Sequence, residues 1–168
     1  YLKNCYGKIL GADDVRTEAS PNVIIFWTGR IPAKEGISLN ELREQVCAEK
    51  EYMISLRRDF HRHPELSLQE RRTAGVIEQE LERFEISHTR IGATGVLGIL
   101  RGTQSGSGVV ALRADIDALP IQETNDVEYR SQTDGIMHAC GHDAHTASLL
   151  GAAKVLSQNR DRFGGELR

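Results

Sequence analysis

The densest group of potential metal ligands in this chain occupies nine consecutive residues, Met137-His138-Ala139-Cys140-Gly141-His142-Asp143-Ala144-His145. This group contains a thiol, three imidazoles and a carboxylate, which are the side chains that bind zinc and similar divalent ions in proteins. A helix-like apolar run over residues 144–156 follows at once. The pattern predicts a glycine-containing loop that holds metal ligands and leads directly into a helix.

Within this loop, Cys140 and His142 are the two strongest ligand candidates. They flank Gly141, so a bend at the glycine would aim both side chains at one ion, with the cysteine held as a thiolate. The alternative is a structural loop with a buried cysteine and surface histidines, in which Asp143 caps the following helix. The density of ligand types favours the metal site.

A second polar group closes the best candidate strand and reads Arg113-Ala114-Asp115-Ile116-Asp117-Ala118-Leu119-Pro120. Asp115 and Asp117 share a face on extended backbone, near the sheet edge where open α/β sheets bind ligands. Two adjacent carboxylates repel unless a cation or a histidine lies between them. They are candidates for the further ligands that a metal site needs. The alternative is a turn in which one aspartate caps backbone donors and the other pairs with Arg113.

Two capping boxes predict where helices begin. They are Ser38-Leu39-Asn40-Glu41, whose helix should run to about His61, and Ser67-Leu68-Gln69-Glu70, whose helix should run to about Phe84. Pro64 ends the first helix, because proline disfavours helical geometry in the residue before it.

The histidines of the segment Phe60-His61-Arg62-His63-Pro64 also suggest metal ligands. We interpret them as structural instead. They lie at a helix end, where positive charge interacts favourably with the carbonyl terminus.

The hydrophobic period then changes from helical to extended. We expect strands over 23–27, 88–91, 95–101 and 108–114, and a hairpin loop over 102–108. The nearly continuous apolar run over 109–112 is typical of a strand covered on both faces. The order of elements predicts an α/β fold, a mixed sheet with flanking helices.

Composition excludes several classes of function. The chain has 168 residues, of which 39% are hydrophobic and 27% charged, as in ordinary globular proteins. Its net charge of −3 argues against binding to nucleic acid or to an anionic membrane, and no apolar stretch approaches the roughly 20 residues of a membrane span. Three widely spaced cysteines suit a reducing compartment, so we expect a cytoplasmic protein.

Four motifs occur in a fixed order along the chain: Arg57-Arg58-Asp59-Phe60-His61-Arg62-His63-Pro64-Glu65-Leu66-Ser67, Thr94-Gly95-Val96, Arg113-Ala114-Asp115-Ile116-Asp117-Ala118-Leu119-Pro120 and Met137-His138-Ala139-Cys140-Gly141-His142-Asp143. Together they resemble the metal-dependent N-acyl-amino-acid amidohydrolases. That family includes hippurate hydrolases, indole-acetyl-amino-acid hydrolases and N-acetyldiaminopimelate deacetylases, and is related to aminoacylase and carboxypeptidase-type metallopeptidases. The resemblance covers roughly residues 39–168, expected to be the amino-terminal part of a catalytic domain that is incomplete at its carboxyl end. Residues 1–38 do not resemble the family and stay unassigned.

The resemblance implies a partial catalytic domain of a zinc-peptidase-like amidohydrolase with two divalent ions, zinc or manganese. Cys140 matches the family's cysteine ligand, which bridges the two ions, and His142 matches its histidine ligand. Asp117 matches a catalytic aspartate that does not bind the metal itself but hydrogen-bonds to a metal ligand and orients it. Asp115 occupies the place where related peptidases carry a histidine ligand, and is the weaker candidate.

The implied reaction is hydrolysis of the amide bond of a small N-acyl amino acid, which releases a carboxylic acid and an amino acid. In such enzymes the ions stabilise the oxyanion, and a glutamate of a Pro-Ala-Glu-Glu type motif moves the proton. That motif does not occur in this sequence, so we expect the chain alone to be inactive. The resemblance further implies a smaller lid or dimerisation domain, absent here, through which a full-length parent would form a homodimer. The alternatives are a non-catalytic metal-binding or interaction module and a dipeptidase or carboxypeptidase-type relative.

Overall fold

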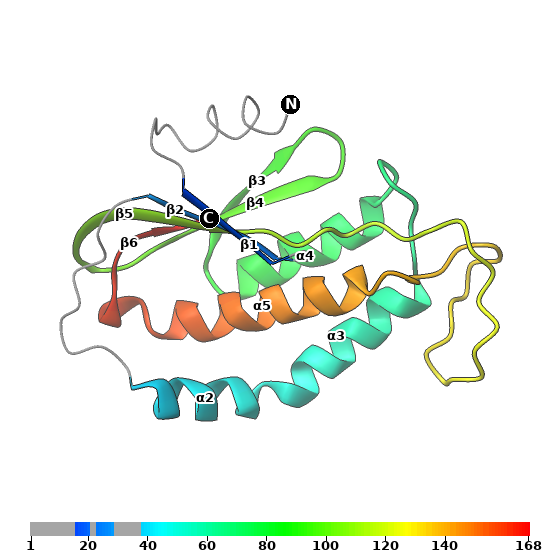
Figure 1. Ribbon diagram of the computed structural model, residues 1–168, viewed down its shortest axis with the longest axis horizontal. Helices are drawn as coiled ribbons and strands as arrows, with labels where there is room; N and C mark the ends of the chain where they lie inside the picture. Colours follow the sequence, from blue (N-terminus) through cyan, green and yellow to red (C-terminus); the bar gives the residue numbers. More distant parts are fainter. Residues whose placement is uncertain (1–15, 21–22, 29–37) are drawn as a thin grey trace. The chain divides into compact units, whose positions relative to one another are not determined.

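A computed structural model describes residues 16–20, 23–28 and 38–168 of the chain (Figure 1). The chain divides into two compact units. We call the first the sheet unit, which combines the described part of Tyr1–Gly36 with Ile99–Arg113 and Asn159–Arg168. We call the second the helical unit, which combines Ile37–Gly98 with Ala114–Gln158.

The helical unit is built around the long helix α5 (His142–Gln158). The unit also contains α2 (Leu39–Ala48), α3 (Lys50–Arg62), α4 (Arg71–Arg83), β3 (Ser87–Ile91) and the start of β4 (Gly95–Arg101). Helix α5 packs against the other three helices, and α3 and α5 lie side by side (Figure 1). Its core consists of buried apolar side chains from these elements and the segments between them, Phe60, Ala74, Leu81, Ile86, Ala118, Ala147, Leu150 and Val155. Within the part of the chain that the structure describes, none of the helices combines the length and apolar character that a membrane crossing requires.

The first predicted helix forms as two helices. Ser38 is the N-cap of α2, and its hydroxyl accepts the Glu41 N–H at 3.1 Å, as expected from the capping box. The chain then turns at Glu49, whose N–H donates to the Val46 carbonyl at 3.2 Å before α3 begins. The sequence gives no sign of this break, because the glutamate and lysine around it are good helix formers. Helix α3 ends at Arg62, as Pro64 predicts.

The second capping box is wrong about the residue that caps the helix. Helix α4 begins after Glu70, which makes no side-chain cap bond. Instead the carboxylate of Glu65 accepts the N–H groups of Arg72 and Thr73, at 3.0 and 2.8 Å. Two carboxylate oxygens satisfy two amides of the first turn and place negative charge at the positive end of the helix. The predicted end is confirmed, since Phe84 is the C-cap.

The sheet unit contains β1 (Arg16–Ser20), β2 (Val23–Thr28), β5 (Gln104–Leu112), β6 (Gly164–Leu167) and the last residues of β4. Its strands are hydrogen-bonded in the order β1-β2-β5-β6-β4, and β4 continues into the helical unit beside β3. Strand β5 is antiparallel to β2 and parallel to β6. The predicted mixed sheet and the strand expected over 23–27 are therefore confirmed.

The hairpin loop predicted over 102–108 is wrong, because β5 already begins at Gln104 and β6 lies between β4 and β5. The glycines of this segment permit a close approach of two backbones. A Cβ on Gly106 would lie 3.0 Å from the carbonyl carbon of Gly164. Gly165 has φ +86 and leaves no room for a Cβ beside the carbonyl of Gly108.

Residues 109–112 are half-buried, so the described chain does not cover this strand on both faces as predicted.

Candidate metal centre

The four candidate site residues all lie in the helical unit. Asp115 and Asp117 follow the end of β5 at Leu112, in a segment that forms no regular strand. Gly141 has φ +86, a left-handed conformation that favours glycine, and α5 begins at the next residue. The expected bend between Cys140 and His142 is therefore present.

The imidazole of His142 is held by Asp117. Its Nδ1 lies 2.9 Å from Asp117 Oδ1 and 3.0 Å from the Asp117 carbonyl oxygen. The His142 and Asp117 side chains are 18% and 28% exposed. Both partners are acceptors, so in the neutral imidazole Nδ1 carries the hydrogen and Nε2 the lone pair. A histidine that donates one N–H to a carboxylate and presents its other nitrogen has the arrangement of a metal ligand.

Cys140 and Asp115 are both exposed. Cys140 is a free thiol. The backbone carbonyl of Asp115 accepts the hydroxyl of Thr146 at 3.2 Å, and the same hydroxyl lies 2.8 Å from the His142 carbonyl oxygen. This segment is thereby linked to the first turn of α5, although the contact involves the backbone of Asp115 and not its carboxylate.

A thiol and a correctly oriented imidazole fit the ligand chemistry of zinc. Within residues 16–20, 23–28 and 38–168, no group of three or more histidine, cysteine, aspartate or glutamate side chains is arranged to hold a metal ion. The described chain therefore offers part of a ligand set, and the assignments of Cys140, His142, Asp117 and Asp115 stay predictions.

Asp143 does not cap α5, contrary to the alternative considered from the sequence. The helix begins at His142, so Asp143 lies inside the first turn and is completely buried. Its Oδ2 accepts Arg57 Nε at 2.7 Å and lies 2.8 Å from His61 Nδ1. Buried carboxylates require such partners, and these draw Asp143 towards α3.

His61 and Glu123 form a buried contact that the sequence did not indicate. His61 Nε2 lies 3.1 Å from Glu123 Oε1, and both residues are at most 3% exposed. Burial raises the pKa of Glu123, but hydrogen bonds from the Ser131 N–H, His61 and Asn125 outweigh it and leave the pKa below its ordinary value. Because both ring nitrogens of His61 are engaged, the structure agrees with the structural role expected for this histidine.

The structure also contradicts the view of a loop with a buried cysteine and surface histidines. His138 is 4% exposed, and neither ring nitrogen has a hydrogen-bond partner among the described residues. Burial lowers the pKa of His138, and the nearby charge of Asp143 opposes this effect. The ring centroids of His138 and His61 are 6.4 Å apart. The sequence motif identified His138 as a polar loop residue but gave no sign of its burial.

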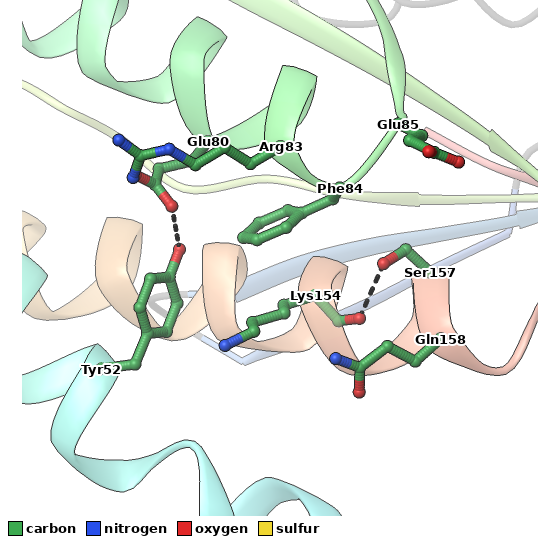
Figure 2. Close-up of a pocket in the computed structure, with 8 residues that line it drawn as sticks. All are labelled: Tyr52, Glu80, Arg83, Phe84, Glu85, Lys154, Ser157 and Gln158. Carbon is green, nitrogen blue, oxygen red and sulfur yellow. Dashed lines mark hydrogen bonds and ion pairs between the residues drawn. The ribbon is translucent and has the colours of Figure 1, made fainter.

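A separate cavity of about 530 Å³ lies near the other end of α5 (Figure 2). It is lined by residues of α3, α4 and α5 and their ends, namely Tyr52, Glu80, Arg83, Phe84, Glu85, Lys154, Ser157 and Gln158. The Tyr52 hydroxyl donates to Glu80 at 2.7 Å, and Lys154 Nζ lies 4.5 Å from the Tyr52 ring centroid. Burial and Glu80 raise the pKa of Tyr52. Lys154 follows His142 by 12 residues, roughly 18 Å along a helix, so this cavity is distinct from the candidate metal centre.

Comparison with known proteins identifies the family of this α/β fold. Residues 111–167 match the family described as Peptidase family M20/M25/M40. The chain belongs to the M20 peptidase family, whose members among its relatives include amidohydrolases, deacetylases and carboxypeptidases.

The relatives are longer than this chain. An N-acyl-L-amino acid amidohydrolase of Geobacillus stearothermophilus is 50% identical over 76% of this chain and 35% of its own length. Thermostable carboxypeptidase 2 of Saccharolobus solfataricus is 43% identical over 77% of this chain and 33% of its own length. The crystal structure of the YXEP protein of Bacillus subtilis, described as a dinuclear metal-binding peptidase, has a TM-score of 0.68 and 46% identity, over 72% of this chain and 34% of that one. The chain thus spans about a third of the length of the relatives it matches.

Proposed function

We propose that this chain supplies Cys140 and His142 to the metal centre of an enzyme that hydrolyses the amide bond of N-acyl amino acids. The products are a carboxylic acid and an amino acid. The observation that carries the proposal is the contact of His142 Nδ1 with Asp117 at 2.9 Å, which directs the lone pair to Nε2. The amidohydrolase relative supports the substrate class.

Each of the three side chains has a distinct role in the proposal. Cys140 would hold the metal, zinc or manganese, as a thiolate, and the description of the YXEP protein as a dinuclear metal-binding peptidase supports a site for two ions. His142 would bind through Nε2, and Asp117 would fix its tautomer and ring orientation. Asp115 is a weaker candidate for a further ligand. The bound metal would polarise the amide carbonyl and lower the pKa of a water molecule.

The activity is proposed for a longer protein that contains this chain. The glutamate expected to move the proton belongs to a motif that is absent from these 168 residues. We therefore propose that the isolated chain is inactive towards N-acyl amino acids, and that homodimer formation would depend on other segments.

A second candidate function is cleavage of a carboxyl-terminal amino acid from a peptide. The observation that favours it is the 43% identity to a thermostable carboxypeptidase. Both reactions hydrolyse an amide beside a free carboxylate, so the same metal centre would serve either one. They differ in the group on the acyl side of the bond.

The two functions are tested with a longer protein that includes this chain, using N-acetyl amino acids and dipeptides as substrates. We expect Cys140→Ala to lose most of its bound metal and at least 100-fold in kcat/KM for the preferred substrate. Cys47→Ala is the matched control, because Cys47 is also a free and exposed cysteine but lies in α2. Metal content and activity of Cys140→Ala equal to those of Cys47→Ala would reject the assignment.

A further inference from the structure

The first turn of α5 is connected to the rest of the helical unit by four ionisable side chains, Arg57, His61, Glu123 and Asp143, which we call the buried bridge. Arg57 and His61 both reach Asp143 Oδ2, at 2.7 and 2.8 Å, and His61 Nε2 lies 3.1 Å from Glu123. The side chains of Asp143, Glu123 and His61 are only 0%, 1% and 4% exposed. The buried bridge therefore joins α3, the segment before the metal loop and the start of α5.

His61 lies at the centre of the buried bridge, between the carboxylates of Asp143 and Glu123. Each ring nitrogen of His61 faces a carboxylate oxygen. The two contacts run in opposite directions from one rigid ring. A glutamine carries both of its N–H groups on a single nitrogen, so it cannot make this pair of contacts. The identity of the residue at position 61 is thus more constrained than its size alone would require.

The Glu123 end of the buried bridge is held by further hydrogen bonds. Glu123 accepts the Ser131 N–H at 2.6 Å and Asn125 Nδ2 at 3.2 Å, and its carbonyl accepts Arg130 at 2.8 Å. Such additional bonds offset the cost of burying charge. The loop around Glu123 therefore forms a rigid support against which His61 can hold Asp143.

The Tyr129 ring packs against the buried bridge. It lies edge-on to His61, with ring centroids 5.4 Å apart, and the guanidinium carbon of Arg57 lies 4.8 Å from its centroid. Charge contacts become stronger where water is excluded. The Tyr129 ring thus adds a contact to both His61 and Arg57 of the buried bridge.

From this geometry we propose that His61 is a positioning residue for the metal loop. Asp143 is the immediate neighbour of His142, so the contact with His61 sets the position of the helix turn from which the His142 ring projects. This inference concerns the proposed metal centre and rests on the proposed function, because it requires His142 to be a metal ligand.

Two matched variants of the chain test the proposal, His61→Gln and His63→Gln. His63 lies two residues further on and makes only a contact with Asp59, with a side chain that is 34% exposed. Two properties are measured. The first is hydrogen exchange of the Ala144 and His145 amides, which bond to the Gly141 carbonyl at the start of α5. The second is the affinity for Zn²⁺ alone, determined by competition with a chromophoric chelator.

We expect His61→Gln to accelerate exchange of the Ala144 and His145 amides about tenfold or more, with little change at Leu150 in the middle of α5. Its zinc affinity should also fall, by no more than the roughly 10- to 100-fold effect of losing a group that contacts a metal ligand directly. His63→Gln should match the unmodified chain in both measurements. If exchange at the start of α5 is the same in both variants, the positioning role is overturned.

The two levels of the proposal can fail separately. If a longer protein that includes this chain binds no Zn²⁺, the proposed metal function is rejected, while the exchange data still decide whether His61 fixes the first turn of α5. Should His61→Gln fail to fold, Glu123→Gln replaces it, because that change keeps the shape of the side chain and removes the charge facing His61. A Glu123→Gln variant with unchanged exchange at Ala144 and His145 would likewise overturn the proposal.

Discussion

The imidazole of His142 is oriented by Asp117, and the proposed metal centre depends on that contact. Asp117 reaches Nδ1 with both its carboxylate and its carbonyl oxygen, at 2.9 and 3.0 Å. Two acceptors around one nitrogen fix both the tautomer and the rotation of the ring. The ligand is then ordered before metal arrives, which lowers the entropy cost of binding.

This orientation leads to a prediction for Asp117→Asn. The amide oxygen can still accept the Nδ1 hydrogen, but the charge that makes the imidazole a stronger ligand is lost. We expect zinc affinity to fall about tenfold or more, measured by chelator competition. Asp115→Asn is the matched variant, since it removes the same charge two residues earlier. A larger loss in Asp115→Asn than in Asp117→Asn would exchange the roles assigned to the two aspartates.

A second prediction concerns the pH dependence of stability. The pKa of Glu123 is lower in the folded chain than its ordinary value of 4.5, so its contacts stabilise the fold above that pH. This stability is lost as the pH falls through the lower, folded-state pKa. The free energy of unfolding, from denaturant titrations, should therefore decrease below about pH 4.5. The decrease should be smaller in Glu123→Gln, and an equally steep decrease in that variant would show that other carboxylates are responsible.

At the residue scale, local spacing predicts what adjacent residues do. The bend of the Cys140-Gly141-His142 loop could be inferred from a short motif, whereas the role predicted for Asp117 came from the family resemblance. The contact between His61 and Glu123 could not, because it joins residues 62 positions apart and no periodic pattern links them. The capping role considered as an alternative for Asp143 fails for the same reason. Its partners lie on α3, far away in the sequence, and they outweigh the local option of capping.

At the level of helices, the crossing of α3 and α5 depends on a small residue. A Cβ on Gly151 of α5 would approach Met53 of α3, with the Met53 Cγ only 2.7 Å away. Gly75 of α4 is different, because a Cβ there would meet nothing within 4 Å. The same substitution at these two glycines therefore separates steric fit from helix propensity.

We predict opposite consequences for Gly75→Ala and Gly151→Ala. Alanine is favoured over glycine inside a helix by about 1 kcal/mol, so Gly75→Ala should raise the free energy of unfolding by up to that amount. At Gly151 the new methyl group displaces Met53, and overpacking of this kind costs about 1–3 kcal/mol. Gly151→Ala should therefore be neutral or destabilising in urea unfolding. Equal stabilisation by the two variants would contradict the close packing of α3 and α5.

The helix boundaries show why elements were predicted better than the contacts between them. Ser38 and Pro64 act within a few residues, and both functioned as expected. Glu65 caps α4 from several residues before the helix, which a four-residue capping box cannot represent. The prediction of a loop over 102–108 was wrong because a glycine-rich segment is compatible with two structures. Glycine is common in turns, but it also permits the close backbone pairing of β5 and β6.

On the scale of the whole molecule, the α/β class followed from the order of helices and strands, whereas the strand order did not. Strand β6 lies between β4 and β5, and β2 pairs with β5 from a segment outside the family resemblance. Such long-range pairing is set by the complete chain. The remaining metal ligands expected for this family are likewise not found among the described residues.

The most direct test of the account is the X-ray absorption spectrum of the zinc-loaded chain. If Cys140 and His142 bind the same ion, the first shell should contain one sulfur at about 2.3 Å and an imidazole nitrogen at about 2.0–2.1 Å. The sulfur should disappear in Cys140→Ser, and the imidazole in His142→Ala. A zinc shell made only of oxygen, or a shell that neither substitution changes, would contradict the assignment of these two residues as ligands.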